Sequence, residues 1–490
     1  QADHEKGFSC ALRPPCSGCM TGAMRSLLLL ACAAIRGTVG YQCATDIYYK
    51  SLHASGKKGL ALDDTTFRSC SSRIPWVWPN TWEPVTSLRL FKAWSSEWSP
   101  AAREIAWGNL AAFVSANNVK ILVGTQITCS SAEDDKDWDW TKQLLNLVSP
   151  SQVMGVAIGN ELDILADKVA VDDTITDECV TGLWQGGSFW STFQQRVDEL
   201  DAMGFGDVPV TTVFTGAALG GSPFIDVPTA SVSTFLKAAS QKYGKRFAFS
   251  FNFYPYFDPG YKLDSGTTDQ CTQARSSAAC FTGSCQVPAS VSLARGKIQQ
   301  VSGNANSLFW VGETGWSSPK AHSLDTQMQW CPEWSSTDVF EKYYRDFLDW
   351  DIDAGGASAP DHIFYFDVRD SFQYGVAEKF GLIETCMSAG CKIRSANYTA
   401  PHNDMFTQEA QSMPWYNWAW LGLGCVVLAA LLLTCVVVRV RKGREFRSLQ
   451  SGSGSGGAAT GVGGGGRDRA GGGGASAAPA AASAEADELT

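Results

Sequence analysis

The strongest constraint on the fold is a repeated order of short apolar runs and longer amphipathic stretches between residues 59 and 383. The apolar runs have the composition of buried strands. Eight of them are Gly59–Leu62, Ser87–Phe91, Val119–Thr125, Val153–Asn160, Val208–Phe214, Phe247–Phe253, Leu308–Glu313 and His362–Asp367. Amphipathic stretches between them predict helices, for example Ala101–Ala116, Asp137–Val148, Phe189–Met203, Val232–Lys242 and Asp338–Asp349. Eight strands that alternate with helices predict a (β/α)8 barrel with long loops.

The alternative α/β arrangement is an open, doubly wound sheet. Such a sheet typically carries a glycine-rich phosphate loop after an early strand, and the sequence has none. The barrel is therefore the preferred prediction. Functional residues are then expected at the carboxyl ends of the strands.

Two predicted strands end in a glutamate beside glycine. Glu161 follows Gly-Asn at the end of the fourth strand, and Glu313 lies in Gly-Glu-Thr-Gly-Trp at the end of the seventh. In a barrel, both side chains are expected in one pocket, and Trp316 could act as a flat apolar platform beside Glu313. The alternative is that a glutamate at a strand end caps the helix that follows.

A pair of carboxyl groups in one pocket suits glycoside hydrolysis, in which one is the acid and the other the nucleophile or base. A retaining enzyme needs the two groups about 5–5.5 Å apart. The acid must begin protonated. Glu161 can fill this role if an apolar surround and a neighbouring anion raise its pKa.

Other chemistries find less support in the sequence. The five histidines are scattered, so a Ser-His-Asp triad would require coincidence, and no His or Cys cluster has the spacing of a metal site. No cofactor is expected. The net charge of −10 and the pI of about 5.1 argue against nucleic acid as a partner. A non-catalytic glucan-binding receptor remains the alternative from a different functional class.

The cysteines suggest an exported chain. Ten of the 16 lie between Cys43 and Cys391, an even number that indicates disulfides of unknown connectivity. Cys271, Cys280 and Cys285 are close enough in sequence to staple one loop. Cys386 and Cys391 are expected to form a small local bridge.

The two ends of the chain have the patterns of targeting segments. Residues 1–40 are interpreted as an upstream extension and a signal peptide, and 41–395 as the barrel domain. Residues 396–417 form a linker, with a glycosylation sequon at Asn397. Residues 418–438 are uncharged, have aromatic residues at their first end and precede a basic segment. They predict one transmembrane helix, and a single-pass type I protein with the barrel outside the cell or in a lumen. Residues 439–490 would then be a basic stop-transfer segment and a disordered cytoplasmic tail.

Five motifs in order resemble glycoside hydrolase family 17, the β-1,3-glucanases and related glucanosyltransferases. They are Arg89-Leu90-Phe91, Gly159-Asn160-Glu161, Asn252-Phe253-Tyr254-Pro255-Tyr256-Phe257, Glu313-Thr314-Gly315-Trp316-Ser317, and Ile363–Asp367 with Glu378–Leu382. The resemblance covers about residues 59 to 385. It implies a β-glucan substrate. Together with the transmembrane helix predicted over residues 418–438, it suggests a membrane-anchored member of the family.

The resemblance also implies roles for individual residues. Glu161 would be the acid/base and Glu313 the nucleophile. Asn160 would bind the sugar hydroxyl next to the reacting carbon, and Arg89 and Tyr254 would hold the nucleophile. The remaining expected contacts to the substrate are stacking by Trp316 and by Tyr256 or Phe257, and a polar contact from Asp367. The last strand departs from the family pattern, because Asp367 leads into Val-Arg-Asp. Hydrolysis and transfer to a second glucan remain open alternatives.

Overall fold

The computed structural model describes residues 53, 55–79, 81, 83–258, 268–318, 331–371, 379–383 and 392. The expected signal peptide, the linker with Asn397, the 418–438 segment and the tail all lie outside these residues. Within the described ranges, no helix is both long enough and apolar enough to cross a membrane.

Eight parallel strands close into a barrel, as predicted. Each strand pairs with its neighbours in sequence order, and the first closes onto the last: Leu60 lies opposite Leu88 on one side and Tyr365 on the other. The strands are β1 (Lys58–Leu62), β2 (Ser87–Leu90), β3 (Lys120–Thr125), β4 (Val153–Asn160), β5 (Val210–Thr215), β6 (Phe249–Asn252), β7 (Phe309–Thr314) and β8 (His362–Tyr365). Predicted and observed strand ends agree to within two residues.

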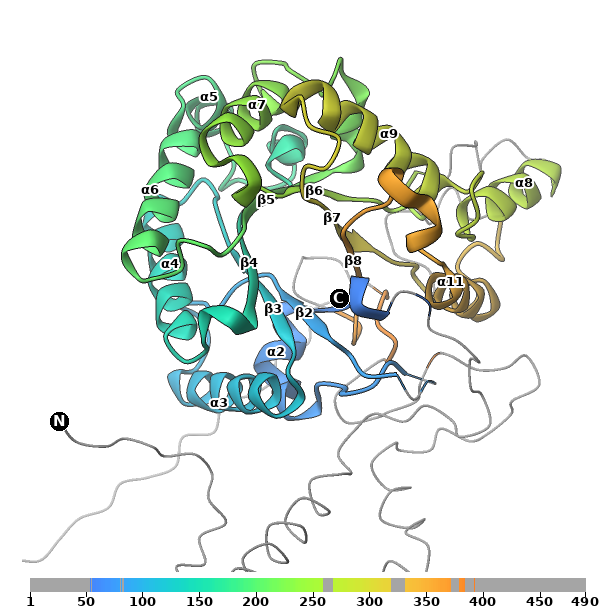
Figure 1. Ribbon diagram of the computed structural model, residues 1–490, viewed down its shortest axis with the longest axis horizontal. Helices are drawn as coiled ribbons and strands as arrows, with labels where there is room; N and C mark the ends of the chain where they lie inside the picture. The colour runs from blue at the N-terminus through green and yellow to red at the C-terminus, as the bar shows by residue number, and fades with distance from the viewer. Residues whose placement is uncertain are drawn as a thin grey trace, which may run out of the picture. The chain divides into compact units, whose positions relative to one another are not determined.

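Helices surround the barrel on its outer side (Figure 1). The α-helices are α2 (Asp64–Cys70), α3 (Pro100–Asn117), α4 (Ser131–Leu145), α5 (Asp177–Trp184), α6 (Ser188–Ala202), α7 (Val232–Tyr243), α8 (Thr268–Ala278), α9 (Gln286–Ser302) and α11 (Thr337–Asp349). Short 3-10 helices are η1 (Ser55–Lys57), η2 (Ser71–Arg73), η3 (Pro150–Gln152), η4 (Leu162–Lys168), η5 (Gly216–Gly220), η6 (Gly244–Arg246) and η8 (Asp353–Ser358). The five helices predicted by name correspond to α3, α4, α6, α7 and α11.

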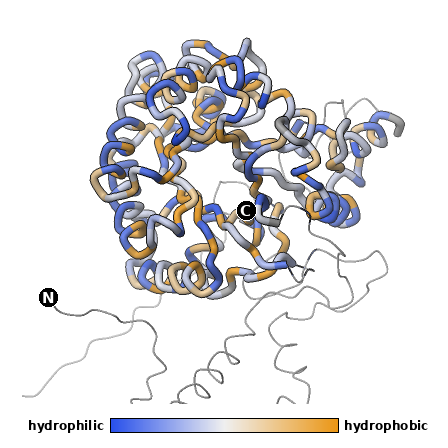
Figure 2. Tube along the Cα trace, viewed as in Figure 1, coloured by the Kyte–Doolittle hydropathy of each residue, from blue (hydrophilic) through white to orange (hydrophobic). Residues whose placement is uncertain are grey.

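The strands are buried almost throughout, which explains why most of their residues are apolar. Their outward side chains pack against the helices, while a smaller cluster fills the barrel interior. The interior cluster consists of Leu122, Ala157, Val213, Ala248, Trp310 and Phe364. Figure 2 shows hydrophobic residues along the central strands and hydrophilic residues over much of the surrounding helices. The barrel is therefore a filled core rather than an open pore.

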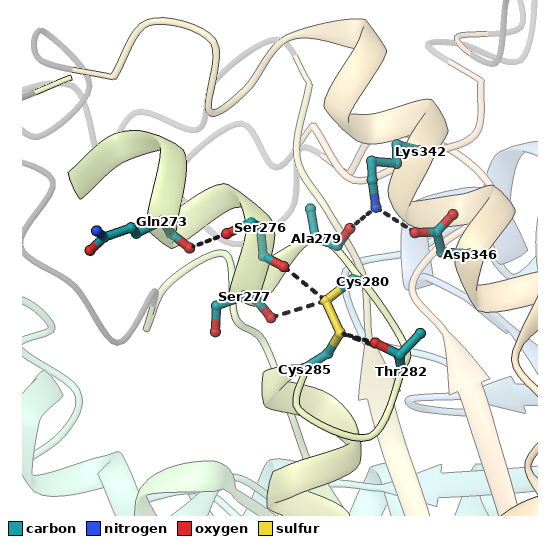
Figure 3. Close-up of a disulfide and its surroundings, with 9 residues drawn as sticks. All are labelled: Gln273, Ser276, Ser277, Ala279, Cys280, Thr282, Cys285, Lys342 and Asp346. Atoms are coloured by element: carbon teal, nitrogen blue, oxygen red, sulfur yellow. Dashed lines mark hydrogen bonds and ion pairs between the residues drawn. A yellow bond between two sulfur atoms is a disulfide. The ribbon is translucent and has the colours of Figure 1, made fainter. Parts of the chain in front are cut away.

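Disulfides secure the loops around the rim. A disulfide between Cys280 and Cys285, which we call the loop disulfide, closes a short loop between α8 and α9 (Figure 3). Cys271 of α8 is bonded to Cys331, 60 residues away, in what we call the α8 disulfide. The expected local disulfide thus forms between two of the three cysteines, whereas Cys271 pairs with a cysteine outside that group. A third bond joins the loop after β3 to α5, between Cys129 and Cys179. Cys386 and Cys391 lie outside the described residues.

Candidate active site

Glu313 lies inside the carboxyl end of the barrel, where β7 places it among three hydrogen-bond donors. Arg89 Nη1 of β2 lies 2.9 Å from Glu313 Oε1 in a buried ion pair. Tyr254, just after β6, donates its hydroxyl to Glu313 Oε2 at 2.6 Å. Asn252 Nδ2 donates to Oε1 at 2.7 Å. These three donors occupy both carboxylate oxygens and hold the side chain in one orientation.

Glu161 reaches the same place from β4 through a local irregularity of the backbone. The pairing of β4 with β5 shifts between Ala157 and Asn160, and Gly159 and Glu161 both have positive φ, 87° and 53°. A left-handed glutamate is strained by roughly 1–3 kcal/mol, a cost that recurs at functional sites. Glu161 occupies the N-cap position of η4, yet its side chain makes no capping hydrogen bond. The helix-capping interpretation therefore does not hold for this residue.

A single amide links the two glutamates. Asn252 Nδ2 lies 2.8 Å from Glu161 Oε1 and 2.7 Å from Glu313 Oε1. The two oxygens are therefore separated by no more than the sum of these distances, 5.5 Å. This upper limit is compatible with the spacing of about 5–5.5 Å in retaining glycosidases and lies below the 6.5–9.5 Å of inverting enzymes.

Arg89 organises the polar cluster at the barrel rim. Its side chain is buried and its Nη2 donates to Asn160 Oδ1 at 2.8 Å, while Nη1 donates to Asn252 Oδ1 at 3.3 Å and pairs with Glu313. Its guanidinium also lies 4.5 Å from the ring centre of Phe91. One arginine thus fixes groups from β4, β6 and β7. A buried cation with three partners is well compensated for the loss of water.

The electrostatics of the pair match an acid beside an anion. Burial, the nearby Glu313 carboxylate and Asp163 raise the pKa of Glu161 to about 7 from its ordinary value of 4.5, while the hydrogen bond from Asn252 lowers it. The direction of this shift is the one that a general acid at Glu161 requires. At neutral pH a large fraction of Glu161 is protonated, as a general acid requires.

The two glutamates lie in a cavity of about 770 Å³. Its lining contains both aromatic and polar residues. The aromatic residues are Phe91, Phe253, Tyr254, Phe257, Phe366 and Phe380, and the polar ones include Lys168, Thr215, Asp258, Gln286 and Ser290. Phe257 is 44% exposed, so a flat ligand could lie against its ring.

Three expected substrate contacts are not found at the cavity. Trp316 is fully buried: its indole nitrogen donates to the Trp334 carbonyl and its ring packs on Tyr343. Tyr256 is also fully buried, and its hydroxyl bonds Ser335. These rings are core residues, so the predictions of a sugar platform at Trp316 and Tyr256 are wrong for this structure.

Asp367 is the third. It has no exposed surface, and its backbone nitrogen and carbonyl pair with Phe380 and Leu382. It follows a cis peptide bond after Phe366, which does line the cavity. The neighbouring aromatic residue, rather than the acidic one, therefore faces the site.

Some site residues were missed by sequence reasoning. The sequence predicted no role for Asn252, although this residue lies within one of the five motifs. It also did not identify the cavity residues Phe91, Phe366 and Phe380. A polar residue at the carboxyl end of a strand was the available signal for Asn252. Within the described ranges, no group of three or more His, Cys, Asp or Glu side chains could hold a metal ion.

Comparisons with known proteins give no assignment beyond the barrel. No family model and no curated protein matches the chain. Among solved structures, a plant beta-glucan endohydrolase is 15% identical, with a TM-score of 0.40 and coverage of 71% of this chain and 96% of that chain. A family 1 β-glucosidase from Thermotoga maritima is 10% identical, with a TM-score of 0.37 and coverage of 69% and 94%. A β-glucosidase from Exiguobacterium marinum is 12% identical, with a TM-score of 0.37 and coverage of 67% and 93%. At these identities and TM-scores, no family membership or activity follows for this chain.

Proposed function

We propose that this protein is a retaining glycoside hydrolase that cleaves β-1,3-glucan. The observation that carries the proposal is the pair Glu161 and Glu313, whose carboxylate oxygens lie within 5.5 Å of each other through one shared amide. The pair differs in environment: Glu313 is surrounded by donors, and Glu161 has a pKa near 7. A general acid with a raised pKa beside a second, firmly positioned carboxyl group is what double displacement requires.

In the proposed mechanism, Glu313 attacks the anomeric carbon while Glu161 protonates the departing oxygen. A glycosyl ester of Glu313 forms, and Glu161 is left as a carboxylate. Glu161 then removes a proton from water, which attacks the same carbon and releases Glu313. Two inversions at one carbon retain its configuration.

The polar and aromatic groups around the pair support a sugar substrate. Arginine can only donate, so its bond fixes Asn160 Oδ1 toward Arg89 and leaves the amide nitrogen of this exposed residue for a sugar hydroxyl. Phe257 offers an exposed ring at the cavity. The β-1,3 linkage is proposed from the five ordered motifs that resemble family 17.

Two alternatives share the same cavity. A second glucan could take the place of water, which would make the protein a β-1,3-glucanosyltransferase that remodels cell-wall glucan. A non-catalytic glucan receptor would also use the aromatic lining. The buried ion pair of Arg89 with Glu313 and the raised pKa of Glu161 favour an enzyme, because binding alone requires neither.

The test is release of reducing sugar from laminarin by the purified full-length chain. Glu161→Gln and Glu313→Gln should each lose at least about 100-fold in kcat. Glu104→Gln, an exposed residue of α3, is the matched control and should keep wild-type activity. Equal activity in wild type and Glu313→Gln would refute the nucleophile. Glucan binding without product from the wild type would favour the receptor, and longer oligosaccharides among the products would favour the transferase.

We also propose that residues 418–438 anchor the protein as a single-pass type I membrane protein, on the basis of sequence alone. The full-length chain should then resist extraction from membranes at alkaline pH. Protease added outside sealed cells should digest the barrel and spare the tail. Complete extraction of the intact chain would refute the anchor.

A further inference from the structure

Asn252 is placed between the two glutamates at the end of β6 and is almost completely buried, with 2% of its surface exposed. Its Nδ2 donates to Glu161 Oε1 and to Glu313 Oε1 at 2.8 and 2.7 Å. Its Oδ1 accepts from Arg89 Nη1 at 3.3 Å. All the polar atoms of this side chain therefore have partners within the site.

The orientation of the amide follows from these partners. A guanidinium has donors and no acceptor, so the oxygen of Asn252 must face Arg89. The nitrogen then faces the carboxylates, and its two hydrogens match the two acceptors. The side chain cannot flip without setting a donor against Arg89 and an acceptor against two carboxylates.

This arrangement has a consequence for catalysis, which rests on the proposed function. In the first step, a Glu313 oxygen bonds the anomeric carbon, the bond from that carbon to the leaving oxygen breaks, and the Glu161 proton passes to that oxygen. The single negative charge of the pair thus moves from Glu313 to Glu161. In the second step, a water oxygen bonds the carbon, its proton passes to Glu161, and the bond to Glu313 breaks. The charge returns to Glu313.

We propose that Asn252 is a positioning residue that holds both carboxylates at once and gives the negative charge a hydrogen-bond donor in each half of the reaction. Arg89 and Tyr254 bond Glu313, the carboxylate that carries the charge at the start. Asn252 donates a hydrogen bond to both glutamates, so it stabilises the negative charge on whichever of them carries it. Its loss should therefore slow both steps.

The experiment measures the two steps separately with dinitrophenyl β-laminaribioside and the full-length chain. A burst of dinitrophenolate reports formation of the glycosyl-enzyme, and the steady state reports its hydrolysis. In Asn252→Ala both rates should fall by roughly 10- to 100-fold, the range expected when a hydrogen bond to a charged group is lost. Asn109→Ala removes a single hydrogen bond to Ser71, away from the cavity, and should leave both rates unchanged. A rate for either step within twofold of wild type in folded Asn252→Ala would overturn the proposal.

A second readout does not depend on turnover. Charged groups facing Glu161 are Glu313 of β7, Asp163 and Lys168 of η4, and Arg89 of β2 through Asn252. With 13C-labelled glutamate carboxyls, the signal lost in Glu161→Gln should titrate near pH 7 in wild type. Its midpoint should rise in Asn252→Ala, because the donated hydrogen bond stabilises the charged form. A purely structural role would lower the Tm and leave the midpoint where it is, which would also overturn the proposal.

The two hypotheses fail differently. If the wild-type chain forms no glycosyl-enzyme and releases no dinitrophenolate, the proposed function fails. The titration still decides whether Asn252 governs the proton on Glu161. If the wild type shows a burst and Asn252→Ala shows the same burst, the same turnover and the same midpoint, the proposed function stands and the role of Asn252 falls.

Discussion

Replacing Gly312 with alanine should disrupt the site without touching a catalytic residue. Gly312 precedes Glu313 on β7 and lies against the polar cluster. An added Cβ would fall 2.6 Å from Asn252 Oδ1, 2.7 Å from Val213 Cγ1 and 2.8 Å from Arg89 Nη1. Ordinary contacts begin at 3.4 Å, so each of these buried atoms would have to move by more than about 0.5 Å in a close-packed core.

The magnitude follows from what would move. Overpacking of this kind costs about 1–3 kcal/mol, which corresponds to a fall in Tm of several degrees. The displaced Arg89 Nη1 is paired with Glu313 at 2.9 Å, and the displaced Asn252 also bonds both glutamates. Because a shift of about 1 Å in a reacting group can cost 100-fold in rate, kcat should fall about 10- to 100-fold.

The assay combines thermal unfolding with laminarin hydrolysis by the full-length chain. Gly108→Ala is the matched control: the exposed Gly108 lies in α3 and an added Cβ there meets nothing within 4 Å. That variant should gain up to about 1 kcal/mol from helix propensity and keep its activity. Wild-type Tm and kcat in Gly312→Ala would show that the packing argument for the Arg89–Asn252–Glu313 cluster is wrong.

Three further predictions follow from the site and its supports. The folded state holds a proton on Glu161 up to about pH 7, whereas the unfolded chain releases it near pH 4.5. The stability of the wild type should therefore fall relative to that of Glu161→Gln as pH rises from 4.5 to 7. The same pH dependence of thermal unfolding in both proteins would contradict this. Phe257→Ala should raise KM for laminarin roughly 5- to 20-fold with a smaller change in kcat, reflecting about 1–2 kcal/mol of lost ring contact; an unchanged KM would remove Phe257 from the binding surface. Removing the α8 disulfide, which spans 60 residues, should destabilise the protein by about 4 kcal/mol. Removing the loop disulfide, which spans 5 residues, should cost about 2 kcal/mol. Denaturant unfolding of the cysteine-to-serine variants measures both losses, and a larger loss for the loop disulfide would contradict the loop-length argument.

The strand pattern was predictable because a parallel barrel buries both faces of every strand. Most strands therefore appear in the sequence as largely apolar runs, and β4 was predicted with the same ends that the structure gives. The carboxyl ends of parallel strands meet at one rim, so Glu161 and Glu313 could be assigned to one pocket from their strand positions alone.

The direction of individual side chains was not predictable in the same way. Trp316 follows the strand end, where the alternation that decides inward and outward no longer applies. Its position depends on Trp334 and Tyr343, which come from a later part of the chain. The sequence near Trp316 does not indicate that packing, so local pattern alone could not distinguish a core tryptophan from a sugar-binding platform.

The role of Asn252 was hidden for a related reason. Its three partners come from β2, β4 and β7, and the register that brings them together includes a shift between β6 and β7 next to Asn252. The left-handed backbone at Glu161 has no sequence signature either, since glutamate rarely adopts it. Local pattern found the strands and their terminal residues, whereas the contacts among those residues depend on barrel closure.

The most direct test of the account is to trap the glycosyl-enzyme. A 2-deoxy-2-fluoro β-laminaribioside with a dinitrophenolate leaving group should inactivate the full-length chain and leave one fluorinated disaccharide on the peptide that contains Glu313, as read by mass spectrometry after digestion. The first product formed from an unmodified substrate should be the β-anomer by proton NMR. A label on a different residue, or an α-anomer as first product, would contradict the assignment of Glu313 as nucleophile and Glu161 as its acid/base partner.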